Sequence, residues 1–300
     1  MKKNLLSFLL IAALTLFTNR GFSQVIDLGE AADFSKSFSL APGGKLTVQV
    51  DCGDVQIVGA EQNTAGIRVE RAVTHASDAD AAKILKEEHV TIELSGNMIS
   101  VLASDPPSLH HFFGWHQPNL EVHYEITVPQ SAEVNVETEG GGISVANLEG
   151  SVKARTEGGS LHFNNMKGKI DGQTEGGDVF AGKCSDELQL KTEAGGITIK
   201  EFAGPSVQAA TEGGSVSADF AQAPKSDCRL ETEGGNVTAR LPDGAAMTLD
   251  AHTDGGSVKT DLPVQVSGEL SGNNLKGTIN GGGPVLRLQT EGGNVRVLKR

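Results

Sequence analysis

Eight acidic side chains recur between residues 139 and 291, and they are the first groups whose chemistry needs an explanation. Each follows a threonine in an octet whose first copy reads Thr138-Glu-Gly-Gly-Gly-Ile-Ser-Val. Carboxylate oxygens suit Ca²⁺, and paired carboxylates can act as general acid and base. The acidic residues are Glu139, Glu157, Glu175, Glu193, Glu212, Glu233, Asp254 and Glu291.

The octet differs from known calcium-binding repeats. The calcium-binding β-roll signature G-G-x-G-x-D ends in an aspartate, whereas the sixth position of this octet is Ile, Leu or Val. If octets stack, neighbouring carboxylates lie about 5 Å apart and repel by roughly 0.8 kcal/mol in water before salt screening. We interpret the acidic edge column as a solvated edge that aids solubility, with specific Ca²⁺ binding as the alternative.

The segment from Leu109 to His116 concentrates rare residue types. It holds the single Trp and three of the eight histidines of a chain with 4% aromatic residues. Packing of these rings against the first coil is the simplest interpretation, and contact with a protein partner or glycan is the functional hypothesis. A metal site is the third interpretation and ranks last, because no nearby Cys or carboxylate completes a ligand set. The residues concerned are His110, His111, Phe112, Phe113, Trp115 and His116.

The remaining chemistry-bearing residues have structural interpretations. The octet threonines share the parity of buried positions and lack an adjacent base, so we expect an inward hydroxyl ladder and no nucleophile. Three cysteines do not make a disulfide framework. Cys184 and Cys228 fall at apolar positions of the repeat, where we expect small buried side chains. The sequence therefore predicts no catalytic residue, no metal ligand and no cofactor.

The elements that carry these residues follow from the repeat. Apolar residues alternate on both sides of each glycine pair, which predicts two short strands per repeat with a sharp corner between them. We expect the corner glycines to adopt positive φ. Unit lengths of 18 to 21 residues favour a parallel β-helix or β-solenoid over an antiparallel hairpin meander. The octets begin at Thr138, Thr156, Thr174, Thr192, Thr211, Thr232, Thr253 and Thr290.

Two features of the repeat are irregular. Extra residues near Gly204, at 221–227 and at 242–244 are expected at corners, where insertions are tolerated. The final step of 37 residues is expected to hold one enlarged coil and one ordinary coil, because Leu275–Ile279 resembles Met166–Ile170. Each octet should then mark one circuit laid directly over the previous one.

Residues 1–137 are expected to contain an export signal and a segment that covers the N-terminal end of the solenoid. Residues 1–23 have a basic start, an apolar stretch and small residues before a cut at Gln24, as in a signal peptide. A lead-in follows at 24–44, a β-rich cap at 45–137 and the solenoid at 138–300. Residues 45–57 read as a rudimentary coil, strands are expected within 67–128, and Ser77 should cap one short helix.

The chain resembles a bacterial family known as putative adhesins, which are β-strand-repeat domains of unknown function. The resemblance rests on the export signal, Gly53-Asp-Val, the strand ending Ile126-Thr-Val-Pro129, and the Thr-Glu-Gly-Gly coils. It covers roughly residues 40–300 and implies a β-helix-like fold at the cell envelope. It supplies no catalytic residues.

Several functions are compatible with this sequence. We favour an exported, non-catalytic binding, adhesion or scaffold module of the periplasm or cell surface, with an envelope protein or a glycan as partner. A β-helix polysaccharide-active enzyme and a sensory or regulatory ectodomain are the alternatives. The net charge of −13 disfavours nucleic acid as a partner. We expect a monomer without a transmembrane anchor in the mature chain.

Overall fold

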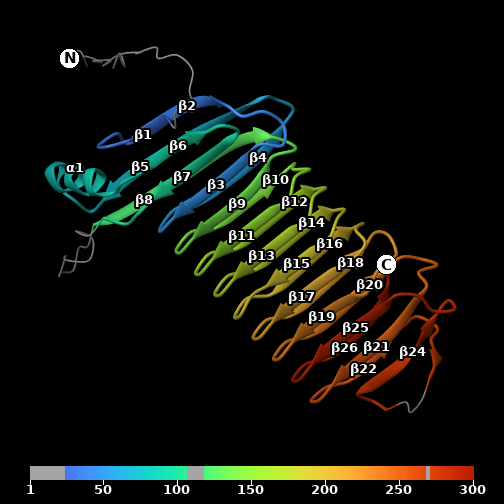
Figure 1. Cartoon of the computed structure of the whole chain (residues 1–300). Helices are drawn as coiled ribbons and strands as arrows, with labels where there is room; N and C mark the ends of the chain where they lie inside the picture. The colour runs from blue at the N-terminus through green and yellow to red at the C-terminus, as the bar shows by residue number, and fades with distance from the viewer. Residues whose placement is uncertain (1–23, 107–117, 268–270) are drawn as a thin grey trace, which may run out of the picture.

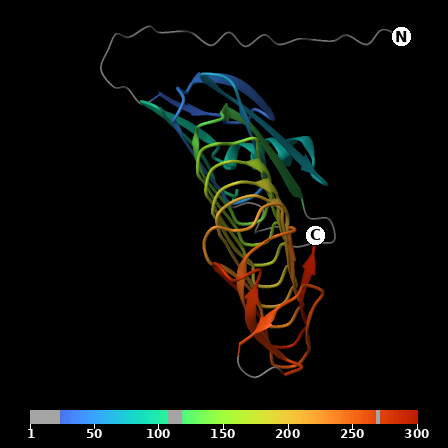
Figure 2. The same cartoon turned by 90° about the vertical axis from the view of Figure 1, so that its right-hand side faces the viewer.

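The protein is an elongated stack of coils. The computed structural model describes residues 24–106, 118–267 and 271–300, and it shows the coils following one another along a single axis (Figure 1). Within these residues, sheet A has 14 strands and sheet B has 12, and each coil of the repeat contributes one strand to each sheet. Seen from another direction, the coils form successive loops around a shared interior (Figure 2). The predicted β-solenoid is confirmed.

The eight octet coils supply eight of the described strands to each sheet, and sheet A also contains β23 (Gln265–Val266) and β24 (Asn274–Ile279) near the C-terminus. Those in sheet A are β9 (Glu133–Thr138), β11 (Val152–Thr156), β13 (Ile170–Thr174), β15 (Leu188–Lys191), β17 (Val207–Thr211), β19 (Cys228–Thr232), β21 (Met247–Thr253) and β25 (Val285–Thr290). Those in sheet B are β10 (Ile143–Ala146), β12 (Leu161–Met166), β14 (Val179–Cys184), β16 (Ile197–Phe202), β18 (Val216–Phe220), β20 (Val237–Leu241), β22 (Val258–Thr260) and β26 (Val295–Lys299). The longer insertions lie between a sheet B strand and the next sheet A strand, as expected.

The strands pair in parallel and in register, so equivalent apolar positions form continuous rows. Ile170, for example, pairs with Val152 on one side and Leu188 on the other. Every second residue is buried between the sheets, and the larger rings of Phe202 and Phe220 contact edge to face at 5.9 Å. The core is therefore one narrow apolar column that runs along the stack.

The corner glycines have a role that differs from the expected one. We expected positive φ at these corners, and this was wrong, because none of the octet glycines has it. The second glycine of each corner instead lies against the preceding coil. A Cβ there would lie 1.8 to 2.1 Å from a carbonyl oxygen below, as at Gly159 over Gly141. The first glycine has more room, and one coil carries Ala194 at that position.

The octet threonines join each corner to the one below. Thr174 is buried, and its hydroxyl donates to the Gly159 carbonyl of the preceding coil at 2.7 Å. The Thr174 hydroxyl oxygen also accepts a hydrogen bond from the Gly177 N–H of its own corner at 3.2 Å. Equivalent hydroxyl bonds occur at all eight octets. The predicted inward hydroxyl ladder is confirmed.

A second ladder of polar side chains, which the sequence did not lead us to expect, runs along the other end of the corner. It uses the residue four positions after the octet threonine, which has a polar side chain in every octet except those of Thr138 and Thr192, where it is glycine. The Asp178 carboxylate accepts from the Gly196 N–H of the next coil at 2.7 Å, and the Asn236 side chain accepts from Asn294 N–H at 2.9 Å. Asp, Asn and Ser at this position thus bind backbone donors that sit just before the sheet B strands.

The N-terminal cap extends both sheets. Sheet A continues with β3 (Lys45–Val50), β7 (Met98–Ala103), β6 (Thr91–Ser95) and β1 (Gln24–Asp27), and sheet B with β4 (Asp54–Ala60), β8 (Asn119–Pro129), β5 (Thr64–Thr74) and β2 (Asp33–Ser39). The coil of β3 and β4 pairs in parallel with β9 and β10, so the rudimentary coil joins the stack. The helix α1 (Asp78–Glu87) follows Ser77, whose side chain accepts from Asp80 N–H as predicted.

The C-terminal end departs from the expected order. The last coil, β25 and β26, lies between two earlier coils: Leu286 pairs with Cys228 on one side and Leu249 on the other. The expectation that every circuit lies directly over the previous one is therefore wrong for the last two octets. The predicted ordinary coil near 275–279 is also wrong, because β24 (Asn274–Ile279) runs antiparallel to β21 and pairs on its other side, again antiparallel, with the preceding strand β23 (Gln265–Val266). The two strands cover the sheet A edge of the terminal coil, whereas β22 remains the edge strand of sheet B.

Alanine at the second corner glycine should destabilise the protein much more than alanine at the first. The Gly159→Ala methyl would lie 2.0 Å from the Gly141 oxygen, whereas the Gly158→Ala methyl would lie 3.7 Å from its nearest neighbour. We expect Gly159→Ala to lower the free energy of unfolding by about 1–3 kcal/mol and Gly158→Ala by under about 0.5 kcal/mol. Urea denaturation measures both, and equal losses would contradict the steric explanation.

Removing one ladder hydroxyl should also weaken the stack. Thr174→Val leaves the Gly159 carbonyl and the Gly177 N–H without this partner, which costs about 1–3 kcal/mol when such groups are buried. Thr198→Val serves as the matched control, because Thr198 faces outward on sheet B. Equal unfolding free energies for the two variants would show that the ladder contributes nothing.

Candidate functional site

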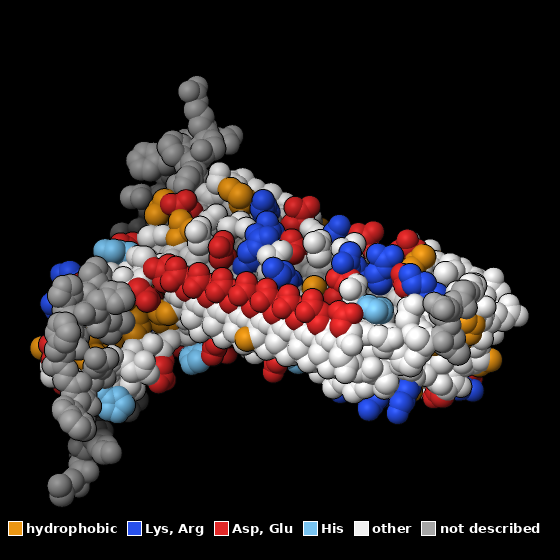
Figure 3. Space-filling view, turned by 90° about the horizontal axis from the view of Figure 1, so that it is seen from below, with side chains coloured by type: hydrophobic (Ala, Val, Ile, Leu, Met, Phe, Trp, Pro, Cys, Tyr) orange, Lys and Arg blue, Asp and Glu red, His pale blue; other side chains and the backbone are white. Residues whose placement is uncertain are grey.

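The eight octet carboxylates lie in one file along an edge of the solenoid, which we call the acidic file. In Figure 3 the file forms a continuous red stripe across the surface. Main-chain bonds fix its spacing, since Glu157 N–H donates to the Glu139 carbonyl and Glu175 N–H to the Glu157 carbonyl, both at 3.2 Å. The C-terminal insertion places Glu291 between Glu233 and Asp254.

The acidic file is longer at its N-terminal end than the octets indicate. Val50 pairs with Thr138 in register, so the following Asp51 occupies the place of an octet acid. Asp51 also accepts from Asp105 N–H at 3.0 Å. The missed signal was the alignment of Val50-Asp-Cys-Gly with Thr-Glu-Gly-Gly, in which the threonine is replaced.

Electrostatic repulsion in the acidic file is visible at Glu139. Its pKa lies above the ordinary value for glutamate, chiefly because the Asp51 carboxylate is close, with smaller effects from desolvation and from Glu157. At the opposite end, the His252 Nε2 lies 2.9 Å from an Asp254 carboxylate oxygen. The two ends of the file therefore have different surroundings: an acidic neighbour at one and an imidazole at the other.

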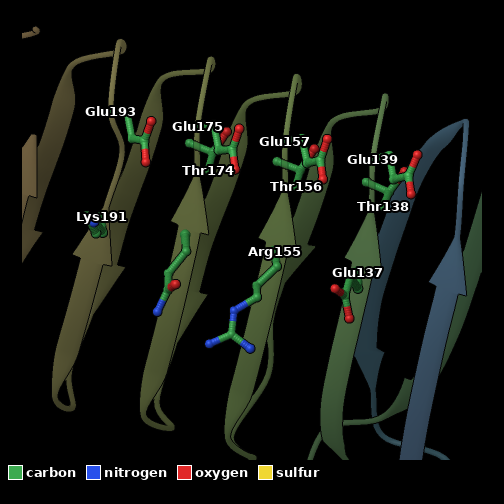
Figure 4. A pocket seen from close by; sticks show the side chains of 11 residues that line it. Glu137, Thr138, Glu139, Arg155, Thr156, Glu157, Thr174, Glu175, Lys191 and Glu193 are labelled. Carbon is green, nitrogen blue, oxygen red and sulfur yellow. The ribbon is translucent and has the colours of Figure 1, made fainter. Parts of the chain in front are cut away.

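A shallow groove of about 270 Å³ runs beside the acidic file over coils β9 to β15. Figure 4 shows Arg155 and Lys191 on the sheet A side of the groove, with the carboxylates of the file above them. The Arg155 guanidinium lies 3.9 Å from Asp171, which is a long, exposed contact. The groove therefore offers both signs of charge to a partner that lies along the solenoid.

The predicted aromatic segment lies outside the described residues. His110, His111, Phe112, Phe113, Trp115 and His116 all fall within 107–117, so their partner or glycan contact stays a prediction. Among the residues that the structure describes, no three His, Cys, Asp or Glu side chains are arranged to hold a metal ion.

Both cysteines assigned to apolar positions are buried and free. Burial raises the pKa of the Cys184 thiol to about 12 and that of Cys228 to about 11. Thiolate is the reactive form of cysteine, so neither side chain is poised for nucleophilic chemistry at neutral pH. Their role is packing, as the sequence indicated.

A buried polar cluster in the cap was not indicated by the sequence. Arg71 is buried and forms an ion pair with Glu88 at 3.2 Å, and its guanidinium also donates to the Gly29 and Ala31 carbonyls. Burial raises the pKa of Glu88, although Arg71 acts in the opposite direction. The cluster joins α1, β5 and the β1–β2 turn, which were separate elements in the sequence.

Neutralising Asp51 should lower the pKa of Glu139. Because the folded state holds Glu139 above its ordinary pKa, the stability that this group contributes falls as the pH rises through that window. Asp51→Asn should move the pKa of Glu139 toward the ordinary value, as followed by an NMR titration of the carboxyl carbon. Glu175→Gln, two coils away, is the control, and an unchanged pKa in Asp51→Asn would contradict the assigned cause.

Comparison with solved structures finds several chains that resemble this one. Solved structures that resemble the chain include a putative adhesin from Bacteroides fragilis NCTC 9343 (10% identity, TM-score 0.47, covering 89% of this chain and 97% of that chain) and a putative adhesin from Parabacteroides distasonis ATCC 8503 (13%, 0.39, 91% and 98%). A putative cell adhesion protein from Clostridium sporogenes ATCC 15579 also matches (12%, 0.28, 89% and 100%). No curated protein matches the sequence.

Within the described ranges, no helix has both the length and the apolar composition that a membrane crossing requires.

The family model described as Toastrack DUF4097 matches residues 61–298, which is most of the sequence. That span includes part of the cap and all eight octets. The chain therefore belongs to the Toastrack DUF4097 family.

Proposed function

We propose that this protein is an exported, non-catalytic module of the cell envelope that binds or scaffolds other envelope components along the side of its solenoid. The observation that carries the proposal is the repetition of the exposed surface. Coil after coil presents a carboxylate at the same edge. The solvated edge that the sequence suggested as an aid to solubility would then also serve as a long recognition surface.

Such a surface suits an extended partner. One exposed charge contributes little to binding on its own, because water and salt screen it. Several equivalent contacts on a rigid rod, engaged together, give an avidity that none of them has alone. An envelope protein or a glycan that lies along the solenoid would engage several coils at once, through the acidic file and the cations Arg155 and Lys191 beside it.

The expected signal peptide supports the proposed compartment. Residues 1–23 predict export, and we place the mature chain in the periplasm or on the cell surface. The net charge of −13 favours partners that are neutral or cationic over nucleic acid or an anionic membrane surface. The role is therefore contact with other envelope components.

Capture from intact envelopes tests the proposal. Tagged protein comprising residues 24–300 should retain envelope material after chemical cross-linking. The triple variant Glu157→Gln, Glu175→Gln, Glu193→Gln should retain several-fold less at low salt. Wild-type capture no greater than that of an unrelated acidic protein would contradict the proposal, and so would turnover of an envelope polysaccharide.

A second triple variant controls for net charge. Glu61→Gln, Glu121→Gln and Glu133→Gln remove the same charge from exposed positions outside the acidic file. This variant should capture envelope material as well as the wild type does. An equal loss in both triple variants would show that overall charge, rather than the file, decides capture.

A further inference from the structure

Two aromatic rings on the outer face of sheet B stack on each other. His162 on β12 and Phe180 on β14 are paired neighbours that point away from the core. Their ring centroids lie 4.5 Å apart and the planes differ by 16°. The Lys200 ammonium lies 5.8 Å from the Phe180 centroid. The same row carries small polar residues in neighbouring coils, such as Ser144 and Thr198.

The geometry of the stack leaves one ring face open. Neighbouring strands lie about 4.8 Å apart, so rings stacked at 4.5 Å must face along the solenoid axis. Phe180 covers one face of His162. The other face points toward the neighbouring strand β10, where the paired residue is Ser144, whose side chain is too small to cover an imidazole.

That open face borders a hollow of about 500 Å³. Its floor is formed by small residues of β10 and the adjoining corners, namely Gly142, Ser144 and Ser160. Gln56 of β4 pairs with Ser144 on the side away from His162, and β8 lies beyond β4. The hollow is therefore a gap in one outward row, with an aromatic wall on one side and a polar wall on the other.

The polar wall offers hydrogen-bonding groups that are held in place. Asp54 accepts from Gly142 N–H at 2.8 Å and lies 3.8 Å from the His123 imidazole. Glu125 is paired with Arg68 at 3.2 Å. Among the described residues, no partner hydrogen-bonds the side chains of Gln56 or Ser144, so an amide and a hydroxyl remain available to a ligand.

We propose that this hollow binds a neutral saccharide, with one pyranose ring stacked on the open face of His162. The inference rests on the proposed function, since it names the chemistry of one envelope ligand. The C–H face of a sugar ring is apolar and suits an aromatic platform, while its equatorial hydroxyls reach side chains at the rim. The Gln56 amide can donate and accept these hydrogen bonds, the Ser144 hydroxyl can donate one, and the Glu125 carboxylate can accept them.

Charge selects against acidic sugars. Three carboxylates, Asp54, Glu70 and Glu125, line the hollow, and Arg68 pairs with two of them. The remaining negative potential repels uronic acids and sulfated sugars. The ligand class is therefore a neutral hexose or N-acetylhexosamine chain, which can continue along the row of outward residues beyond the stacked ring.

Titration of the mature chain with defined sugars tests the inference. The probes are neutral trisaccharides of glucose, mannose, galactose and N-acetylglucosamine, with trigalacturonate as the acidic counterpart. At least one neutral probe should shift the imidazole proton signals of His162 and His123 in NMR spectra, and trigalacturonate should not. If no neutral probe shifts the His162 signal at 10 mM (roughly tenfold above a 1 mM dissociation constant), the inference is wrong.

Variants separate binding from folding. His162→Ala should weaken binding of the active probe at least tenfold while leaving the thermal unfolding transition in place, because the side chain is exposed. Thr238→Ala, in the same outward row of β20, is the matched control and should bind as the wild type does. Undiminished binding by His162→Ala would also overturn the proposal.

The envelope experiment distinguishes this inference from the proposed function. Sugar binding without envelope capture by the wild type would support the hollow and contradict the envelope role. Envelope capture that is unchanged in His162→Ala, together with silent sugar titrations, would leave the envelope role standing and overturn the saccharide site. Preference for an aromatic ligand such as adenosine over every neutral sugar would show that the platform is real and its ligand class is different.

Discussion

The close approach of one corner to the next is the constraint on which this structure depends. Each second glycine lies against a carbonyl oxygen of the coil below, with no room for a methyl group. The octet threonine then donates to that carbonyl and accepts from the glycine N–H of its own corner. A buried corner without these bonds would leave backbone groups unsatisfied. The Thr-x-x-Gly pattern therefore allows the coils to stack closely: the glycine leaves room for the neighbouring backbone, and the threonine satisfies the backbone groups at the corner.

A stack of identical coils has the weakness that both ends expose unpaired strand edges, and this protein protects each end with strands that are out of sequence order. At the N-terminus the coil of β3 and β4 lies between the repeat and β7 with β8. At the C-terminus the last coil lies between the coils of β19 with β20 and β21 with β22. The outermost strands on both sheets of the cap, and on sheet A at the C-terminus, are antiparallel. The stack therefore ends on antiparallel strands at three of its four sheet edges, whereas on sheet B the C-terminal edge strand is β22, which pairs in parallel with β26.

The division between inward and outward positions explains where function can reside. Residues in the inward rows are fixed by core packing. The second corner glycines are fixed by their contact with the coil below, so substitution at either kind of position lowers stability. Outward-facing side chains neither pack in the core nor occupy the close contact at the corners. Two outward rows carry unusual side chains: the acidic file at the corner edge and the His162–Phe180 stack on sheet B. One feature is repeated in every coil and the other occurs once, which suits a shared scaffold with a local binding site.

The sequence by itself determined the architecture because the repeat encodes local and periodic physics. Alternation around each Gly-Gly pair specified two strands per coil, and the shared parity of the threonines specified their burial. The same regularity aligned the octet acids along one edge. The role of the corner glycines was misread, because a sequence shows that glycine is present and not whether space or φ requires it.

Tertiary structure alone decided three things. The last coil could be placed between two earlier ones because every coil offers the same parallel template, so the sequence gives no signal for order. Asp51 joined the acidic file through register with Thr138 rather than through a matching motif. The hollow beside His162 required knowing that Ser144 and Gln56, far apart in the chain, lie side by side. Long-range pairing determines each of these, and local residue patterns carry no information about it.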